Sequence, residues 1–238
     1  MKIRLFTIPN LLTLSNLMCG SLAILSALVF GRLDWSFWLL LLAATFDFLD
    51  GFAARLLKCV SPIGVELDSL ADMISFGLTP AVILYVMTTA SLPAEEVGLH
   101  FAFAGVSFLI AAFSALRLAK FNIDDTQHTE FCGLPTPANA LFFASLGLIY
   151  AQTGADWSAY SYYLLAVGVV MACLLVSPIR MFAFKFQGFG WQGNQIRYGF
   201  ILVALVLIPL LRLYAVPAIV LLYILLSTLR WVACRSKR

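Results

Sequence analysis

The chain has few charged residues and no hydrophilic stretch long enough to form a separate soluble domain. Asp, Glu, Lys and Arg make up 11% of its 238 residues, whereas soluble domains average roughly a quarter. The hydrophobic fraction is 62%, and the mean hydropathy is +0.97. A net charge of +3 is too small to indicate nucleic-acid binding. We therefore expect an integral membrane protein with no nucleic-acid partner.

Sites built from cysteine or histidine are also not expected. The five cysteines are scattered without a CxxC spacing, which is typical of small apolar packing residues. The two histidines, His100 and His128, are isolated in expected loops, and we expect neither to be a metal ligand. The N-terminal apolar run is too long for the core of a signal peptide and is followed by no convincing cleavage site, so we expect it to be a membrane span.

Eight apolar segments fit the requirement for crossing the hydrocarbon core, which takes about 20 residues per helix. They run approximately over residues 8–30, 35–53, 64–90, 97–119, 138–152, 159–177, 199–211 and 214–232. The seventh is short and contains Pro209, so a merged helix across Arg212 would give seven spans. The predicted fold is an all-α, polytopic membrane helix bundle that forms one domain over residues 1–238. The last two helices, about 199–232, are expected to be peripheral.

The basic residues predict the orientation of this bundle. With eight spans and both termini in the cytoplasm, every Lys and Arg except Arg32 and Arg212 falls on the cytoplasmic side. This distribution follows the positive-inside rule. The outer loops, 91–100 and 153–157, carry acidic residues but no Lys or Arg. We therefore expect a protein of the cytoplasmic membrane.

A cluster of acidic residues interrupts the apolar sequence of the second and third spans. Ionisable groups at membrane depth are costly and usually functional. Four of them lie on two helix faces, at i, i+3 and i, i+4 spacing: Asp47, Asp50, Asp68 and Asp72. Gly51, Ala54 and Gly64 share these faces and leave room beside the acids. We expect the two helices to direct four carboxylates into one space, at the cytoplasmic edge of the membrane, next to a slot for a substrate.

The chemistry of such a cluster predicts bound cations. Four carboxylates in one space cannot all stay ionised without them. Oxygen ligands without Cys or His suit Mg²⁺ or Mn²⁺, and two such ions form the usual clamp for in-line phosphoryl transfer. Arg55 follows the cluster closely and can offer its guanidinium to a phosphate oxygen. The sequence therefore predicts two divalent cations, Mg²⁺ or Mn²⁺, and a phosphate-bearing substrate.

A structural role and a transport role for the acidic residues also stay open at this point. The acids of the second span would be structural if they only paired with the basic residues nearby, Arg55 and Lys58. Alternatively, the four acids would bind a transported divalent cation, because pumps and antiporters also carry buried acids. Against transport, the acids lie at one edge of the membrane and form no chain across it. A transporter would move cations without any nucleotide-linked lipid and would tolerate the loss of Arg55.

The residues around the cluster resemble a known motif. From Asp50 to Asp72 the chain reads Asp-Gly-x2-Ala-Arg-x8-Gly-x3-Asp-x3-Asp, and Asp47 stands three residues upstream. This spacing resembles, without a gap, the signature of the CDP-alcohol phosphatidyltransferases. Further segments resemble the bacterial and archaeal phosphatidylserine synthases of that family: residues 8–16, 66–81, 117–122, 131–138 and 177–180. The resemblance covers most of the first 185 residues.

This resemblance implies an enzyme in which an alcohol displaces CMP from a CDP-linked lipid, with two divalent cations at the four aspartates. Asp47 and Asp68 would ligate both ions. Asp50 would complete one metal shell and Asp72 the other. Asp72 would also be the general base that takes the proton from the attacking hydroxyl. The residues implied in binding the CDP group are Gly51, Ala54, Arg55, Gly64, Asn10 and Thr13.

The subgroup implies CDP-diacylglycerol and L-serine as substrates in the lipid bilayer, and a homodimer. Serine carries a carboxylate and an ammonium group, so its pocket needs a cation and a hydrogen-bond acceptor near the metals. The candidates at the cytoplasmic ends of the fourth and sixth spans are Arg117, Lys120, Asn122 and Arg180. Alternatively, these residues only contact anionic lipid headgroups.

The acceptor and the activity itself have further alternatives. Glycerol 3-phosphate or an inositol phosphate would attack by the same chemistry, but each would favour a denser basic pocket than this chain offers. A non-catalytic scaffold that kept the fold is the remaining alternative. The intact aspartates, Gly51 and Arg55 argue against a scaffold.

Overall fold

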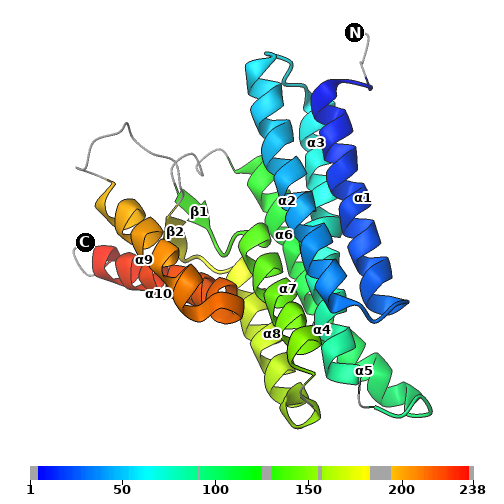
Figure 1. The fold of residues 1–238 in the computed structure, drawn as a ribbon. Coiled ribbons are helices and arrows are strands. Elements are labelled where there is room, and N and C mark those ends of the chain that lie inside the picture. Colours follow the sequence, from blue (N-terminus) through cyan, green and yellow to red (C-terminus); the bar gives the residue numbers. More distant parts are fainter. Residues whose placement is uncertain (1–4, 91, 125–129, 155–156, 183–193, 236–238) are drawn as a thin grey trace.

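The computed structural model describes residues 5–90, 92–124, 130–154, 157–182 and 194–235, and most of them are helical (Figure 1). The helices are α1 (Ile8–Leu28), α2 (Leu33–Leu56), α3 (Pro62–Asp72), α4 (Thr79–Thr89), α5 (Val97–Ser107), α6 (Leu109–Ile123), α7 (Thr136–Thr153), α8 (Ser161–Leu175), α9 (Gln195–Leu211) and α10 (Ala215–Arg235). A π-helical segment, Met73–Leu78, joins α3 to α4. Two short strands, β1 (Glu130–Cys132) and β2 (Arg180–Phe182), pair antiparallel.

The prediction of an all-α membrane bundle is confirmed. Within the described residues, six helical stretches are long and apolar enough to cross a membrane: Ile8–Leu28, Leu33–Leu56, Pro62–Thr89, Val97–Ile123, Ser158–Leu175 and Gln195–Cys234. Each of the eight predicted segments is helical, including the one that forms α7. The last stretch divides at Arg212, which has a φ of +48°, so the chain there forms two helices rather than one merged helix.

Two helix starts meet at the end of the bundle where α2 finishes (Figure 1). At the start of α1 the Thr7 hydroxyl accepts a hydrogen bond from the Asn10 backbone N–H at 3.4 Å. At the start of α3 the Ser61 hydroxyl accepts one from the Gly64 backbone N–H at 3.2 Å. Both helices also carry a proline in the first turn, where no backbone donor is lost. These caps fix the ends of the two helices that lie beside the acidic part of α2.

A close approach of α1 to the π-helical segment fixes the depth of the acidic residues. A Cβ atom at Gly20 would lie 2.7 Å from the Ser75 Cα, so only glycine permits this contact. The Ser75 hydroxyl donates to the Ala71 carbonyl at 2.9 Å within the same turn. The π-helical geometry begins directly after Asp72, and such segments are frequent at functional sites. It follows that Asp72 is held where α1, α3 and the π-helical segment meet.

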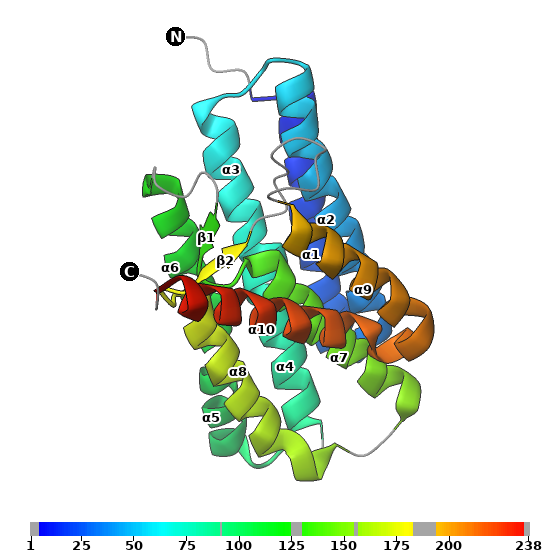
Figure 2. The same ribbon diagram turned by 90° about the vertical axis from the view of Figure 1, so that its left-hand side faces the viewer.

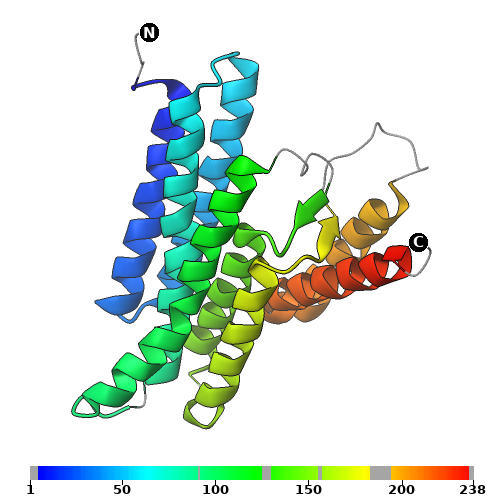
Figure 3. The ribbon, with the colours of Figure 1, turned by 180° about the vertical axis from the view of Figure 1, so that it is seen from behind.

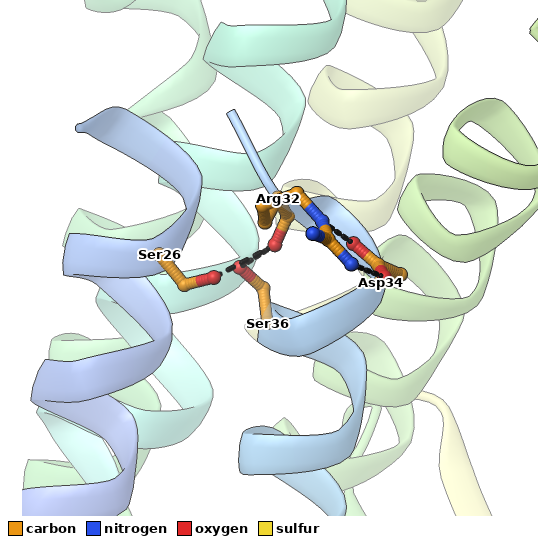
Figure 4. Close-up of polar contacts among 4 residues, drawn as sticks. All are labelled: Ser26, Arg32, Asp34 and Ser36. Atoms are coloured by element: carbon orange, nitrogen blue, oxygen red, sulfur yellow. Dashed lines mark hydrogen bonds and ion pairs between the residues drawn. The ribbon is translucent and has the colours of Figure 1, made fainter. Parts of the chain in front are cut away.

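The opposite end of α1 and α2 carries a polar turn (Figure 4). The Ser26 and Ser36 hydroxyls both donate to the Arg32 carbonyl, at 2.8 and 3.2 Å. The Arg32 guanidinium pairs with Asp34 at 2.6 Å in a largely exposed ion pair. This turn lies far along α2 from the acidic cluster, so its residues are suitable positions for control substitutions.

The hairpin of α9 and α10 crosses the other helices at a steep angle instead of running parallel to them (Figures 1 and 2). Helix α10 packs against α7 and against β2, and Figure 3 shows the same crossing from behind. The Tyr223 hydroxyl of α10 donates to the Phe182 carbonyl of β2 at 3.0 Å. The hairpin therefore lies at the side of the bundle, with its second helix attached to the core.

Candidate active site

The structure brings three of the four predicted metal ligands together. Asp47 and Asp50 of α2 and Asp68 of α3 each direct a carboxylate oxygen into a group whose members lie within 4.8 Å of one another. Asp50 is buried, and the other two are partly buried. This geometry follows from the packing of α1 against both helices, which directs their acidic faces toward each other.

The residues present fit an oxygen-ligated divalent cation. Within the described part of the chain, no Lys or Arg forms a salt bridge with any of the four aspartates, so a purely structural pairing with Arg55 and Lys58 is not supported. The Asp68 Oδ1 atom is buried and has no hydrogen-bond partner among the described residues. A buried carboxylate oxygen without a partner is costly, and a hard cation such as Mg²⁺ or Mn²⁺ would satisfy it.

Helix α1 supplies polar partners to two of the acids. The Thr13 hydroxyl donates to Asp50 Oδ2 at 2.6 Å, a short charge-assisted hydrogen bond. The Asn16 side-chain N–H donates to Asp72 Oδ1 at 3.2 Å. Thr13 was predicted as a nucleotide contact, and the structure places its hydroxyl on a predicted metal ligand. Asn16 was missed, although its spacing of three residues from Thr13 put it on the same helix face.

Asp72 lies outside the group of three and faces a different space. Its side chain is buried, with 9% of its surface exposed. It lines a second cavity together with Asp68, and Asp68 also lines a first cavity beside Asp50. Asp68 therefore stands at the junction of two cavities, with Asp50 on one side and Asp72 on the other.

The first cavity has a volume of about 190 Å³ and contains the whole predicted CDP-binding set. Its lining includes Asn10, Thr13, Gly51, Ala54, Arg55 and Gly64. A Cβ atom at Gly64 would lie 3.2 Å from the Ser61 hydroxyl and 3.3 Å from Asn10 Oδ1, so glycine lets these polar groups approach. At Gly51 the nearest atom to such a Cβ is an Arg55 guanidinium nitrogen, 4.0 Å away. The missing side chain at Gly51 thus leaves open space beneath the guanidinium, where a flat or phosphorylated group fits.

The second cavity is larger, about 850 Å³, and most of its lining residues are apolar. Its polar lining residues include Asp68, Asp72, Ser69, Arg117 and Asn122. The Asn122 side-chain N–H donates to the Ser69 hydroxyl at 2.9 Å, which links α6 to α3. Two of the four predicted acceptor residues, Arg117 and Asn122, therefore line the same cavity as Asp72.

Arg117 is buried, but not all of its hydrogen-bond donors have a partner among the described residues. Its side chain is 8% exposed, and its Nη1 donates to the Thr136 hydroxyl at 3.1 Å. The guanidinium carbon lies 6.0 Å and 5.9 Å from the ring centres of Phe121 and Phe131, within range of a cation–π contact. Its Nε has no hydrogen-bond partner among the described residues. A buried cation with a free donor, lining a cavity, is suited to an anionic ligand.

The other two predicted acceptor residues lie elsewhere. Lys120 is exposed, and its Nζ contacts the Cys132 sulfur at 3.5 Å. Arg180 is exposed on β2, in register with Cys132 on β1. Neither residue is among the described residues that line the two cavities. Thr136, which holds Arg117, was missed as a site residue although it lies within the Gly-Leu-Pro-Thr-Pro segment of the resemblance.

The fold and the site together define a class of protein. An all-helical membrane bundle directs oxygen-only acidic ligands toward two cavities, one lined by small residues and an arginine. This is the arrangement of a membrane-embedded enzyme of metal-assisted phosphoryl transfer. The chain belongs to the CDP-alcohol phosphatidyltransferase family, whose model matches residues 6–177. The resemblance seen in the motif is confirmed, and so is the prediction of an enzyme.

Relatives of known name extend the comparison beyond the motif. The chain is 34% identical to the CDP-diacylglycerol–serine O-phosphatidyltransferase of Bacillus subtilis over 181 residues, which cover 75% of this chain and 91% of that protein. It is 32% identical over 231 residues to the protein of the same name from Helicobacter pylori, covering 95% and 92% of the two chains. A Methanocaldococcus jannaschii protein of this name is 39% identical over 139 residues, covering 58% and 59%.

Proposed function

We propose that this protein transfers the phosphatidyl group of CDP-diacylglycerol to the hydroxyl of L-serine, giving phosphatidylserine and CMP. The observation that carries the proposal is the pair of cavities that meet at Asp68. One is lined by the residues that the resemblance implies in nucleotide binding, and the other by a buried arginine together with the proposed base, Asp72. The names of the relatives support the choice of donor and acceptor.

In this proposal the aspartates hold two divalent cations, Mg²⁺ or Mn²⁺. Asp47, Asp50 and Asp68 are close enough to share ions, and Asp72 would complete the second metal shell from the side of the larger cavity. When bound, the ions neutralise the diphosphate and polarise the attacking and leaving oxygens. The Thr13 hydroxyl leaves one oxygen of Asp50 free for a metal, because it occupies only Oδ2.

The proposed reaction is an in-line displacement. Asp72 takes the proton from the serine hydroxyl, and Asn16 keeps the carboxylate oriented through its hydrogen bond. The serine oxygen forms a bond to the phosphorus that carries the diacylglycerol. The bond from this phosphorus to the bridging diphosphate oxygen breaks, and CMP leaves with the electron pair. Arg55 would hold the phosphate of the departing nucleotide.

We assign the serine carboxylate to Arg117. Among the described residues that line the larger cavity, Arg117 is the only Lys or Arg, which suits an acceptor with one carboxylate better than a phosphorylated acceptor. Asn122 lines the same cavity and would offer an amide oxygen to the serine ammonium group. Lys120 and Arg180 would then contact anionic headgroups or approaching substrate outside the cavity.

Replacing Arg117 by Lys is expected to raise the KM for serine about 10- to 100-fold while changing kcat less. The lysine keeps the charge but loses the planar fork that binds a carboxylate through two hydrogen bonds. Steady-state kinetics with varied serine at saturating CDP-diacylglycerol measures the effect. Arg32→Lys, at the far end of α2, is the matched control and should behave as wild type. An unchanged KM for serine in Arg117→Lys would contradict the assignment.

The membrane topology remains part of the proposal. The distribution of basic residues supports eight spans, both termini in the cytoplasm, and a site that faces the cytoplasm from the cell membrane. The CDP-lipid would then enter sideways from the inner leaflet, and CMP would leave into the cytoplasm. The homodimer implied by the resemblance stays a prediction, which the mass of the purified protein in detergent would test.

A product assay on the purified full chain tests the proposed function. CDP-diacylglycerol and Mg²⁺ or Mn²⁺ are supplied with labelled serine, glycerol 3-phosphate or inositol phosphate in parallel reactions. We expect CMP release and a labelled lipid with serine alone. If product formed only with a phosphorylated acceptor, the proposed mechanism would stand but serine would not be the acceptor. No CMP release with any acceptor would refute the enzyme and favour a cation transporter.

A further inference from the structure

The larger cavity has far more space than an amino acid needs. Its volume of about 850 Å³ lies in the range of pockets for drug-sized ligands, roughly 300–1,000 Å³, whereas serine has only a handful of non-hydrogen atoms. Its lining includes a few polar residues, among them Asp72 and Arg117, and is otherwise mainly aromatic and aliphatic. A long apolar ligand attached to a polar reacting group fits this shape.

Part of the apolar wall comes from the hairpin that crosses the bundle. Helix α10 contributes Ile219, Val220 and Tyr223, and α9 contributes Phe200. The wall is fixed in place, because the Tyr223 hydroxyl donates to the Phe182 carbonyl at 3.0 Å. The Tyr223 ring also packs edge-on against Phe182 and Phe200, with ring centres 4.8 and 6.0 Å away. With its hydroxyl engaged on β2, Tyr223 adds mainly ring surface to the wall.

Two exposed side chains of the bundle also line the cavity. Phe48 of α2 and Val65 of α3 line the cavity and are 68% and 46% exposed. In a membrane bundle, exposed apolar side chains face lipid. Phe48 directly follows Asp47 on α2, and Val65 precedes Asp68 by one turn of α3, so the lipid-facing side of the cavity lies next to the carboxylates. A lipid chain can reach the reacting centre from this side without leaving an apolar environment.

We infer that this cavity binds a fatty acyl chain of the CDP-lipid donor, and that Val220 and Ile219 of α10 determine which chains fit. The inference rests on the proposed function, since the phosphorus under attack carries the diacylglycerol. The smaller cavity, of about 190 Å³, is lined by the nucleotide-binding set, so it leaves no space for a chain. The α9–α10 hairpin follows residues 6–177, the range that the family model matches.

Selectivity at this wall is expected to be steric. Lipid tails are as apolar as the cavity, so moving a chain from the bilayer into the cavity gains little hydrophobic free energy. A side chain that protrudes into the cavity, in contrast, excludes a chain that would occupy the same volume. A short chain occupies much less of the cavity and can avoid the added side chain.

The test compares long- and short-chain donors in wild type and Val220→Trp. Purified full-length protein in mixed micelles receives dioleoyl or dihexanoyl CDP-diacylglycerol with saturating serine and metal. We expect Val220→Trp to lower kcat/KM for the dioleoyl donor about tenfold or more and to leave the dihexanoyl reaction within about twofold of wild type. Leu221→Trp adds the same indole on a lipid-facing position, 54% exposed, and should change neither reaction.

A second variant keeps the inference falsifiable if the tryptophan disturbs the fold. Ile219→Ala enlarges the cavity and should shift the ratio of long- to short-chain activity toward longer or branched chains. A chain-length ratio unchanged from wild type in both Val220→Trp and Ile219→Ala would overturn the inference. Failure of the proposed function is distinct, because wild type itself would then release no CMP from either donor.

Discussion

Asp72→Asn is expected to reduce CMP release from CDP-diacylglycerol and serine by about 10²- to 10⁴-fold, the contribution typical of a general base. The amide has the size of the carboxylate and still offers an oxygen to the Asn16 side chain, which donates to Asp72 at 3.2 Å. It cannot accept the serine proton at neutral pH. Binding of the CDP-lipid should be largely retained, because the proposed nucleotide-binding residues line the other cavity.

The control for this variant is another Asp→Asn change on the same pair of helices. Asp34 pairs with Arg32 at the opposite end of α2 (Figure 4), so Asp34→Asn should leave the rate unchanged. Initial rates of CMP release measure both variants, and equilibrium binding of the CDP-lipid separates a lost base from a lost site. A rate within a factor of about three of wild type in Asp72→Asn would remove Asp72 from the role of base.

Asp68→Asn is expected to remove most of the stabilisation that bound metal gives. Three carboxylates within 4.8 Å repel one another when no cation is present, so the variant without metal should melt at the same temperature as wild type or higher. With saturating Mg²⁺ or Mn²⁺, wild type should gain roughly 5 °C or more, and the variant should gain little. Activity should fall about 10³-fold, since Asp68 stands between both cavities.

Glu66→Gln is the matched control for this second prediction. Glu66 lies two residues from Asp68 on α3, is exposed, and is outside the group of three acids. Its substitution should change neither the metal-dependent melting temperature nor the rate. Melting curves in detergent with and without metal measure the effect. If Asp68→Asn kept the full metal-dependent stabilisation of wild type, the aspartate cluster would not be the metal site.

Several contacts in the site depend on long-range packing and could not be predicted from spacing. Asn16 on α1 and Asp72 on α3 are 56 positions apart, and Arg117 reaches Thr136 across the β1 region. Such pairs form only once helices pack at particular depths, which here depends on glycine contacts such as Gly20 against Ser75. Lys120 and Arg180 were predicted to line the acceptor pocket from their positions at the ends of apolar segments. In the packed structure neither residue lines one of the two cavities.

The sequence by itself determined the class of protein, the helical segments and the acidic site. Hydropathy sets which segments enter the membrane, and the helical repeat places Asp47 with Asp50 and Asp68 with Asp72 on shared faces, whatever the tertiary structure. Only the tertiary structure decided that the acidic residues line two cavities. It also decided that Val220 and Tyr223 of α10 form part of the wall of the larger cavity. The physical reason is that local periodicity fixes the face of a helix, whereas crossing angles and cavity walls arise from side chains distant in sequence that pack together.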